Sequence, residues 1–131
     1  MGNYLTHMVL LLISREIVVP DQGNHRIQIC NSQGQLVRKF GSKGAGNGQL
    51  NSPVGVGLLS NGNIVVSECD GNRLQIFDSQ GKFVRIVGAG QFKYPIHLFV
   101  DSDDNILVAD QDNKCIQVFT RMVTTSRPLM W

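Results

Sequence analysis

The feature that most constrains this chain is that it repeats itself. Ile17–Gly41 aligns with Ile64–Gly88 at 12 of 25 positions without a gap. A third copy, which includes Ile106–Phe119, begins 42 residues after the second. Self-similarity at a period of this size indicates a repeat architecture, so the fold class is decided by what one copy forms and how copies pack.

Within each copy, short runs rich in Val, Ile and Phe are bounded by Gly, Asn, Asp and Ser, which is typical of strands and turns. No window shows a sustained helical period. The second copy predicts four strands, at Val54–Leu59, Ile64–Ser67, Leu74–Phe77 and Phe83–Val87. Ser60–Asn63 and Asp78–Gly81 supply residues that tolerate positive φ where antiparallel strands reverse. Four-stranded units at this period predict an all-β fold built from propeller blades.

We expect residues 1–131 to form a single partial domain. Its parts are repeat 1 at about 8–49, repeat 2 at about 50–91, repeat 3 at about 92–119 and a divergent tail at 120–131. The first period is longer because the linker after Gly41, SKGAGNGQ, is longer than the linker after Gly88, which is only AGQ. Surface loops absorb such insertions at little cost. The tail departs from the pattern where a glycine and a fourth strand should appear, which favours a truncated third unit.

Composition narrows the classes of partner. Twelve Lys and Arg stand against 10 Asp and Glu, a formal charge of +2, so affinity for a polyanion would have to come from where the charges sit. The three cysteines form no Cys-x-x-Cys pair, so neither a disulfide framework nor a zinc knuckle is indicated, and we expect a reducing, cytoplasmic setting. The longest apolar run, Met8–Ile13, is too short to span a membrane, and no membrane partner is expected.

The unit around Pro53–Gly88 reads P-x-G-V, then N-I-V-V-x-E/D, then N-R-L/I-Q-I-F-D-x-x-G. This pattern resembles the NHL repeat, and the resemblance covers about residues 8–119. The first copy contains the tripeptide Asn24-His25-Arg26 itself. The only tryptophan is Trp131, so the Trp-Asp signature of another propeller repeat is absent. The Gly-rich linker before Pro53 is most similar in style to tripartite-motif NHL (TRIM-NHL, Brat-like) proteins.

The resemblance implies a propeller that closes with six blades. The sequence holds three innermost-strand positions, at Met8–Leu12, Val54–Leu59 and Ile96–Val100. We therefore expect an NHL-type β-propeller that is partial, with about three four-stranded antiparallel blades, half of a six-bladed ring. Because an open half-ring leaves apolar blade faces uncovered, we expect either a fragment of a longer chain or self-association of half-rings.

Residues that recur at one repeat position are expected to do the same structural job in each copy. Asp21 with Arg26, and Glu68 with Arg73, are predicted to tie the loop between the second and third strands. In the third copy the arginine is replaced by Cys115, which predicts a looser loop. The recurrent glutamines, for which we expect hydrogen bonds to neighbouring backbone groups and no binding role, are Gln28, Gln75 and Gln117.

The resemblance implies that the rim formed by these loops and by the blade-to-blade linkers is the binding face. The candidate rim residues are Asn24, His25, Arg26, Lys43, Asn72, Arg73, Phe92, Lys93, Tyr94, Asn113 and Lys114. The acids Asp70 and Asp112 share this rim. Cations beside the aromatic pair Phe92 and Tyr94 are what a site for single-stranded RNA requires. The alternative is an ordinary solvated rim with Phe92 packed between blades.

We therefore expect a non-catalytic binding module that presents its rim to single-stranded RNA or to a protein partner. The resemblance places such a module in a ubiquitin ligase or a post-transcriptional regulator, or in a pure interaction scaffold. Some NHL-like propellers are metal-dependent lyases or lactonases, but the innermost strands here offer only His97. Since His7, His25 and His97 fall at different repeat positions, we predict no metal, no cofactor and no catalytic residues.

Overall fold

The computed structural model describes residues 11–13, 15–120 and 127–130. These residues form three four-stranded antiparallel sheets, each a meander in chain order, and one short 3-10 helix, η2 (Gln22–Asn24). Blade 1 comprises β1 (Leu11–Ile13), β2 (Glu16–Asp21), β3 (Arg26–Cys30) and β4 (Leu36–Phe40); blade 2 comprises β5 (Pro53–Leu58), β6 (Ile64–Glu68), β7 (Arg73–Phe77) and β8 (Phe83–Val87); blade 3 comprises β9 (Pro95–Val100), β10 (Ile106–Asp110), β11 (Cys115–Phe119) and β12 (Arg127–Met130). No helix in the described ranges is long and apolar enough to cross a membrane.

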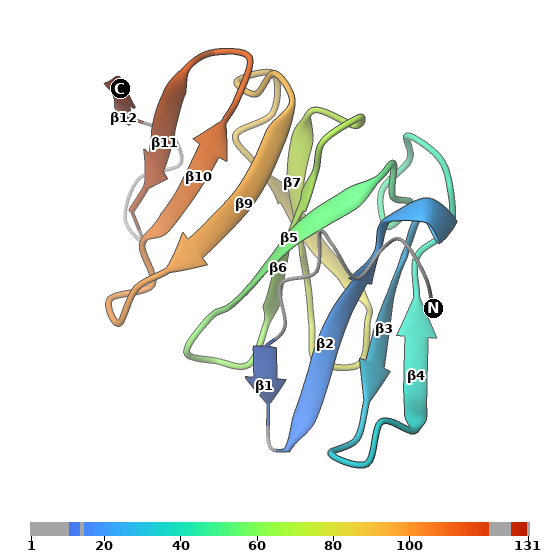
Figure 1. Cartoon of the computed structure of the whole chain (residues 1–131). Coiled ribbons are helices and arrows are strands. Elements are labelled where there is room, and N and C mark those ends of the chain that lie inside the picture. Colours follow the sequence, from blue (N-terminus) through green and yellow to red (C-terminus); the bar gives the residue numbers. More distant parts are fainter. Residues whose placement is uncertain (1–10, 14, 121–126, 131) are drawn as a thin grey trace.

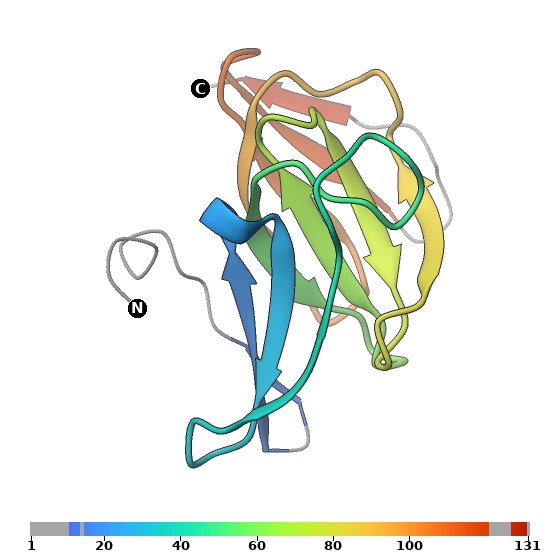
Figure 2. The same ribbon diagram turned by 90° about the vertical axis from the view of Figure 1, so that its right-hand side faces the viewer.

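The blades stand side by side, and blade 2 lies between blades 1 and 3 (Figures 1 and 2). This arrangement confirms the predicted all-β fold, a partial propeller of four-stranded antiparallel blades. The strands expected in the second copy agree with β5 to β8 to within one residue at each end. The first expected strand, Met8–Leu12, overlaps β1, and its residues 8–10 lie outside the described part of the chain.

The fourth strand of blade 3 was not expected from the sequence. Arg127–Met130 pairs with β11, with Cys115 opposite Met130 and Gln117 opposite Pro128. Strand pairing uses backbone groups, so it does not require the side-chain pattern that the tail lacks. Pro128 is compatible with this position because β12 is an edge strand, where a missing N–H is tolerated. The expectation of a truncated third unit is therefore wrong for this strand.

Two apolar cores hold the blades together. Between blades 1 and 2 lie Val18, Ile27, Ile29, Leu50, Val56, Ile64, Val66 and Phe77. Between blades 2 and 3 lie Val65, Leu74, Ile76, Val87, Phe92, Leu98, Ile106, Val108 and Phe119. Alternate residues of β6 enter opposite cores because successive side chains of a strand point to opposite faces. A continuous apolar run such as Ile64–Val66 is therefore explained by burial on both faces.

Glycines in β5 allow blade 3 to come close. A Cβ built on Gly55 would lie 2.8 Å from the carbonyl oxygen of Ile96 and 2.6 Å from Oγ of Ser67. One on Gly57 would meet the side chains of Leu98 and Val100. The start of β9 thus packs almost directly on the backbone of β5, and this contact brings the loops of blades 2 and 3 together.

The outer face of blade 3 has no cover among the described residues. Phe99 is 63% exposed, and Leu107 and Ile116 on the same face are half-buried. Their equivalents in blade 2 include Val65 and Leu74, which blade 3 covers completely. Self-association of half-rings and the presence of further blades both stay predictions.

Candidate functional site: the loop rim and its axial pocket

A recurrent hydrogen-bond network builds the rim. In blade 1 the buried carboxylate of Asp21 accepts hydrogen bonds from Asn24, Arg26 and Gln28, at 3.0, 2.9 and 2.8 Å. The two carboxylates at the equivalent positions, Glu68 and Asp110, are also fully buried and make equivalent contacts. The predicted tie between acid and arginine is confirmed in blade 1.

In blade 2 the same network also fixes the long Gly-rich linker. Nε of Arg73 donates to Glu68 at 2.7 Å, and its other nitrogens donate to the carbonyl oxygens of Ala45, Gly46 and Gln49. The Arg73 side chain is only 12% exposed. This confirms the second predicted tie, and it also means that the guanidinium group is occupied by contacts within the chain.

The recurrent glutamines donate hydrogen bonds to the recurrent acids as well as to the backbone groups that the sequence predicted. Nε2 of Gln75 donates to Glu68 at 2.8 Å as well as to the backbone oxygen of Gln49. Oε1 of Gln75 accepts from Gly48, which lies in the long linker. The equivalent Oε1 of Gln117 is buried without a hydrogen-bond partner in the described residues.

The loop of blade 3 keeps two hydrogen bonds to the recurrent acid without the arginine. Asp110 accepts from Nδ2 of Asn113 at 2.7 Å and from the backbone N–H of Lys93 at 2.8 Å. Lys114 has the same φ of 54° as its equivalents His25 and Asn72. Asn113 is the equivalent of Asn24 and keeps its contact with the carboxylate, while the contact made by the arginine in blade 1 is missing; the looser loop stays a prediction.

The hydrogen bonds of Asp21 predict an acid-sensitive blade 1. Burial raises the pKa of this carboxyl, but the donors Asn24, Gln28 and Arg26 outweigh it and hold the pKa below its ordinary value of 3.8. A carboxyl with a lowered folded-state pKa stabilises the fold fully above its unfolded pKa. That stability is lost as the pH falls through the folded-state pKa.

We therefore expect the urea midpoint of the wild type to decline as the pH falls below about 4. D21N should have a lower urea midpoint at pH 7, and its midpoint should depend less on pH. Urea unfolding followed by circular dichroism from pH 7 to pH 3 measures both. D103N is the matched control, because it removes one carboxylate from an exposed turn. Equal declines for D21N and the wild type would contradict the assignment.

Residues with positive φ link neighbouring loops. Nδ1 of His25 accepts a hydrogen bond from the backbone N–H of Ser52, at 3.0 Å. At the equivalent positions one blade later, Oδ1 of Asn72 accepts from Tyr94 N–H at 2.7 Å. His25 and Asn72 therefore act as contacts between blades. Lys114 has the third equivalent position, but an ammonium group cannot accept a hydrogen bond.

Phe92 does not belong to an exposed aromatic pair. Its side chain is 6% exposed, and its ring packs on Phe119 with centroids 5.5 Å apart in the core between blades 2 and 3. It cannot stack on a base, so its inclusion among the rim candidates is wrong. In the repeat register Phe92 is equivalent to Leu50, which is also completely buried.

The rim candidates thus divide into two groups. Those whose polar side-chain groups are bound within the chain are Asn24, His25, Arg26, Asn72, Arg73 and Asn113. Those left facing solvent are Lys43, Lys93 and Lys114, together with the half-buried Tyr94. The exposed acids Asp70 and Asp112 lie among them.

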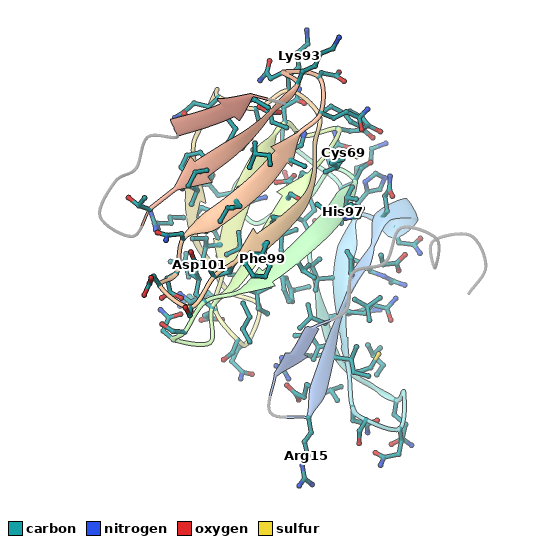
Figure 3. All side chains as sticks on the ribbon, turned by 60° about the vertical axis from the view of Figure 1, so that its left-hand side comes forward. Arg15, Cys69, Lys93, His97, Phe99 and Asp101 are labelled. Atoms are coloured by element: carbon teal, nitrogen blue, oxygen red, sulfur yellow. The ribbon has the colours of Figure 1, made fainter. Side chains whose placement is uncertain are left out.

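A pocket of about 340 Å³ opens at the centre of this rim. It is lined by Gln22, Val54, Cys69, Tyr94, Ile96, His97 and Gln111. Gln22, Cys69 and Gln111 are the same repeat position in blades 1, 2 and 3, directly after the recurrent acid. Because equivalent residues of three blades converge on it, this axial pocket lies around the axis that relates the blades. Figure 3 shows two of its residues, Cys69 and His97, close together, with Phe99 farther along β9.

Reading the sequence missed Gln22, Cys69 and Gln111 as site residues. The signal that could have found them is their register, because each directly follows the recurrent acid of its copy. His97 was noticed only as an isolated histidine. The described residues contain no group of three or more His, Cys, Asp or Glu side chains that could hold a metal ion.

Cys69 and Tyr94 are coupled inside the pocket. Sγ of Cys69 is buried, accepts from Nε2 of Gln22 at 3.9 Å and is hydrogen-bonded to the Tyr94 hydroxyl. Burial raises the pKa of the Cys69 thiol. The hydrogen bond to Cys69 raises the pKa of Tyr94, and the charges of Asp70 and Asp112 act in the same direction. Both groups are thus neutral at physiological pH, and Cys69 is no activated nucleophile.

Comparison with protein families decides the nature of the repeat. The model of the NHL repeat matches residues 50–77 and 92–119. Two segments of the chain thus match the NHL repeat. Comparison with curated protein sequences gives no significant match.

Solved structures share the propeller-like fold at low sequence identity. A streptogramin B lyase is 18% identical with a TM-score of 0.73, covering 93% of this chain and 39% of its own. Virginiamycin B lyase from Staphylococcus aureus is 20% identical with a TM-score of 0.74, covering 93% and 40%. The WD40 repeats of RRP9 are 10% identical with a TM-score of 0.75, covering 93% and 38%. The NHL chain thus spans less than half the length of each of these proteins.

Proposed function

We propose that this NHL-repeat chain is a non-catalytic module that binds a protein partner through its loop rim. The observation that carries the proposal is how the rim uses its charges. Arg26 and Arg73 are bound to buried carboxylates, and Phe92 is buried, so the rim exposes three lysines and part of Arg26 among two acids and one half-buried tyrosine. A tyrosine beside a pocket, within a polar and solvent-accessible rim, is the arrangement found at many protein interfaces.

Single-stranded RNA is the second candidate. It is favoured by the exposed Lys43, Lys93 and Lys114. A base-stacking platform, however, requires accessible rings and a groove of concentrated positive charge. The burial of Phe92 removes one of the two rings on which this hypothesis depended, so protein is the better supported partner.

The similarity of the Gly-rich linker to tripartite-motif NHL proteins supports a finer proposal. In that setting the rim would recruit a substrate for a ubiquitin ligase, or a partner of a post-transcriptional regulator, in the cytoplasm. The likeness to streptogramin-type lyases concerns the fold, and we propose no catalytic residues for this chain.

The test compares two charge-reversal variants. K93E/K114E changes the rim, whereas K39E/K82E makes the same charge change at exposed sites on β4 and in the turn before β8. Each chain is immobilised and the proteins that it captures from cell extract are quantified. Affinity for poly-uridylate is measured in parallel at two salt concentrations.

We expect the wild type and K39E/K82E to capture the same set of proteins. K93E/K114E should capture at least about tenfold less of this set, because the reversed charges at the rim no longer complement those of the partner. Poly-uridylate should bind weakly. If the RNA instead binds with a steep dependence on salt and K93E/K114E abolishes this, the partner is RNA. Capture that is indifferent to rim charge would refute a rim-binding module of either kind.

A further inference from the structure

The axial pocket differs from the rest of the rim because several of its polar groups have spare hydrogen-bonding capacity. The side chains of His97 and Gln111 make no hydrogen bond to any other described residue. Gln22 uses its Nε2 on Cys69, which leaves its Oε1 free of described partners. On the rest of the rim, the side chains of Asn24, Arg73 and Gln75 donate to the buried recurrent acids. The pocket is thus a part of the rim that can recognise a group from outside.

These free groups include three acceptors, and the amide nitrogen of Gln111 and the His97 ring also offer donors. Gln22 and Gln111 each present an amide oxygen, and His97 presents a ring nitrogen. They enter from blade 1 and blade 3, on either side of Cys69 in blade 2. A ligand with several donors spread in one plane would satisfy them together.

The charges nearest the pocket are negative. Asp70 and Asp112 directly follow the pocket residues Cys69 and Gln111, and both raise the pKa of Tyr94. Figure 3 shows Lys93 at the outer tip of the molecule, apart from Cys69 and His97. The field in the pocket therefore favours a cation and opposes phosphate or carboxylate groups.

The Tyr94 ring adds a surface for stacking. A guanidinium group is planar, permanently charged, weakly hydrated and able to stack on an aromatic face while it donates hydrogen bonds at its edge. An ammonium group offers three donors but no planar surface. The volume of about 340 Å³ holds one such side chain with room for its aliphatic stem.

We propose that the axial pocket binds the guanidinium group of an arginine side chain supplied by a partner protein. This inference rests on the proposed protein-binding function and specifies the chemistry that the partner must carry. Gln22, His97 and Gln111 accept its hydrogen bonds, Tyr94 stacks on it, and Asp70 and Asp112 attract it.

The test uses the full 131-residue chain and small probes. N-acetyl-arginine amide is titrated into the isotope-labelled protein and followed by amide and side-chain chemical shifts. N-acetyl-citrulline amide has the same length but carries a neutral urea in place of the guanidinium. Q111K places a positive charge at the pocket, and Q80K makes the same change in the exposed turn before β8, at the opposite end of the blades.

We expect shifts confined to the pocket residues, with affinity about tenfold lower for the citrulline probe and about tenfold lower for Q111K, since both remove a charge-assisted interaction. Q80K should bind as the wild type does. Equal affinity for both probes, shifts elsewhere on the surface, or no saturable binding would overturn the assignment.

The titration with the arginine probe and the capture experiment test different claims, so each can fail without the other. If rim-dependent capture of proteins persists while the arginine probe does not bind, the pocket assignment falls and the proposed function stands. If the probe binds but capture is unaffected by K93E/K114E, the pocket recognises guanidinium but the proposed rim-binding function falls.

Discussion

Replacing Glu68 by alanine is expected to lower the free energy of unfolding by about 3–5 kcal/mol, as is usual when one partner of a buried ion pair is removed. The carboxylate is completely buried and accepts hydrogen bonds from Arg73, Gln75 and the backbone N–H of Asn51. Without it, three donors lose their acceptor in a site that water does not reach freely. Because domains of this size are stabilised by only about 5–15 kcal/mol, E68A is expected to lie close to its unfolding midpoint.

Urea unfolding followed by circular dichroism measures the effect. E68Q keeps one acceptor oxygen and should lie between E68A and the wild type. E16A is the matched control: Glu16 also pairs with an arginine, Arg38 at 2.9 Å, but at a partly exposed site where solvent screens the pair. E16A should therefore change stability far less. Equal losses for E68A and E16A would show that burial does not set the strength of the network.

A substitution at Glu68 should also affect the Gly-rich linker directly, in addition to its effect on the stability of the fold. Arg73 binds the linker carbonyls of Ala45, Gly46 and Gln49 while Glu68 holds its Nε. In E68Q, the weakened anchor should loosen this linker before the blade unfolds, which amide hydrogen exchange at residues 44–49 would report.

The strands and their turns could be predicted because their causes are local. The Asn-Gly step at Asn61 and Gly62 provides positive φ at the reversal, and Gly62 has φ of 90°. β12 could not be predicted, because its pairing depends on the proximity of β11 and on no side-chain pattern of its own. Local chemistry thus accounts for the elements that the repeat encodes, and tertiary context accounts for the tail.

The site was less accessible to prediction, for a different reason. The candidates Arg26, Arg73 and Phe92 have the right chemistry for binding, but burial assigns Arg73 and Phe92 to the structure, and Arg26 binds a buried carboxylate through Nε while its side chain stays 32% exposed. The register with Leu50 already indicated that Phe92 belongs to a core. Gln22 and Gln111 became visible as site residues only when the blades brought one repeat position together around a pocket.

Replacing Gly55 by alanine is expected to cost about 1–3 kcal/mol, the usual penalty for adding a methyl group to a packed interface. The new Cβ would lie 2.8 Å from the carbonyl oxygen of Ile96, a backbone atom that can move only with β9 itself. It would also press on Oγ of Ser67, which donates to Ile96 and accepts from the Gly55 N–H. One methyl group thus disturbs both the packing and the hydrogen bonds that join β5 to β9.

G57A and G23A test whether this cost arises from backbone contact. At Gly57 the nearest atoms are the ends of the Leu98 and Val100 side chains, which can rotate, so G57A should be milder. At Gly23 no atom lies within 4 Å, so G23A should be close to neutral. Similar stabilities for all three variants in urea unfolding would mean that β5 and β9 are not in the close contact described.

The same substitution should also alter the axial pocket. Val54 on β5 and Ile96 and His97 on β9 all line it, so a displacement of β9 by an alanine at position 55 changes the shape of the pocket. We therefore expect G55A to weaken binding of the arginine probe under conditions where the variant is still folded, while G23A leaves it unchanged. Full probe affinity in a destabilised G55A would show that the pocket does not depend on the packing of blade 3 against blade 2.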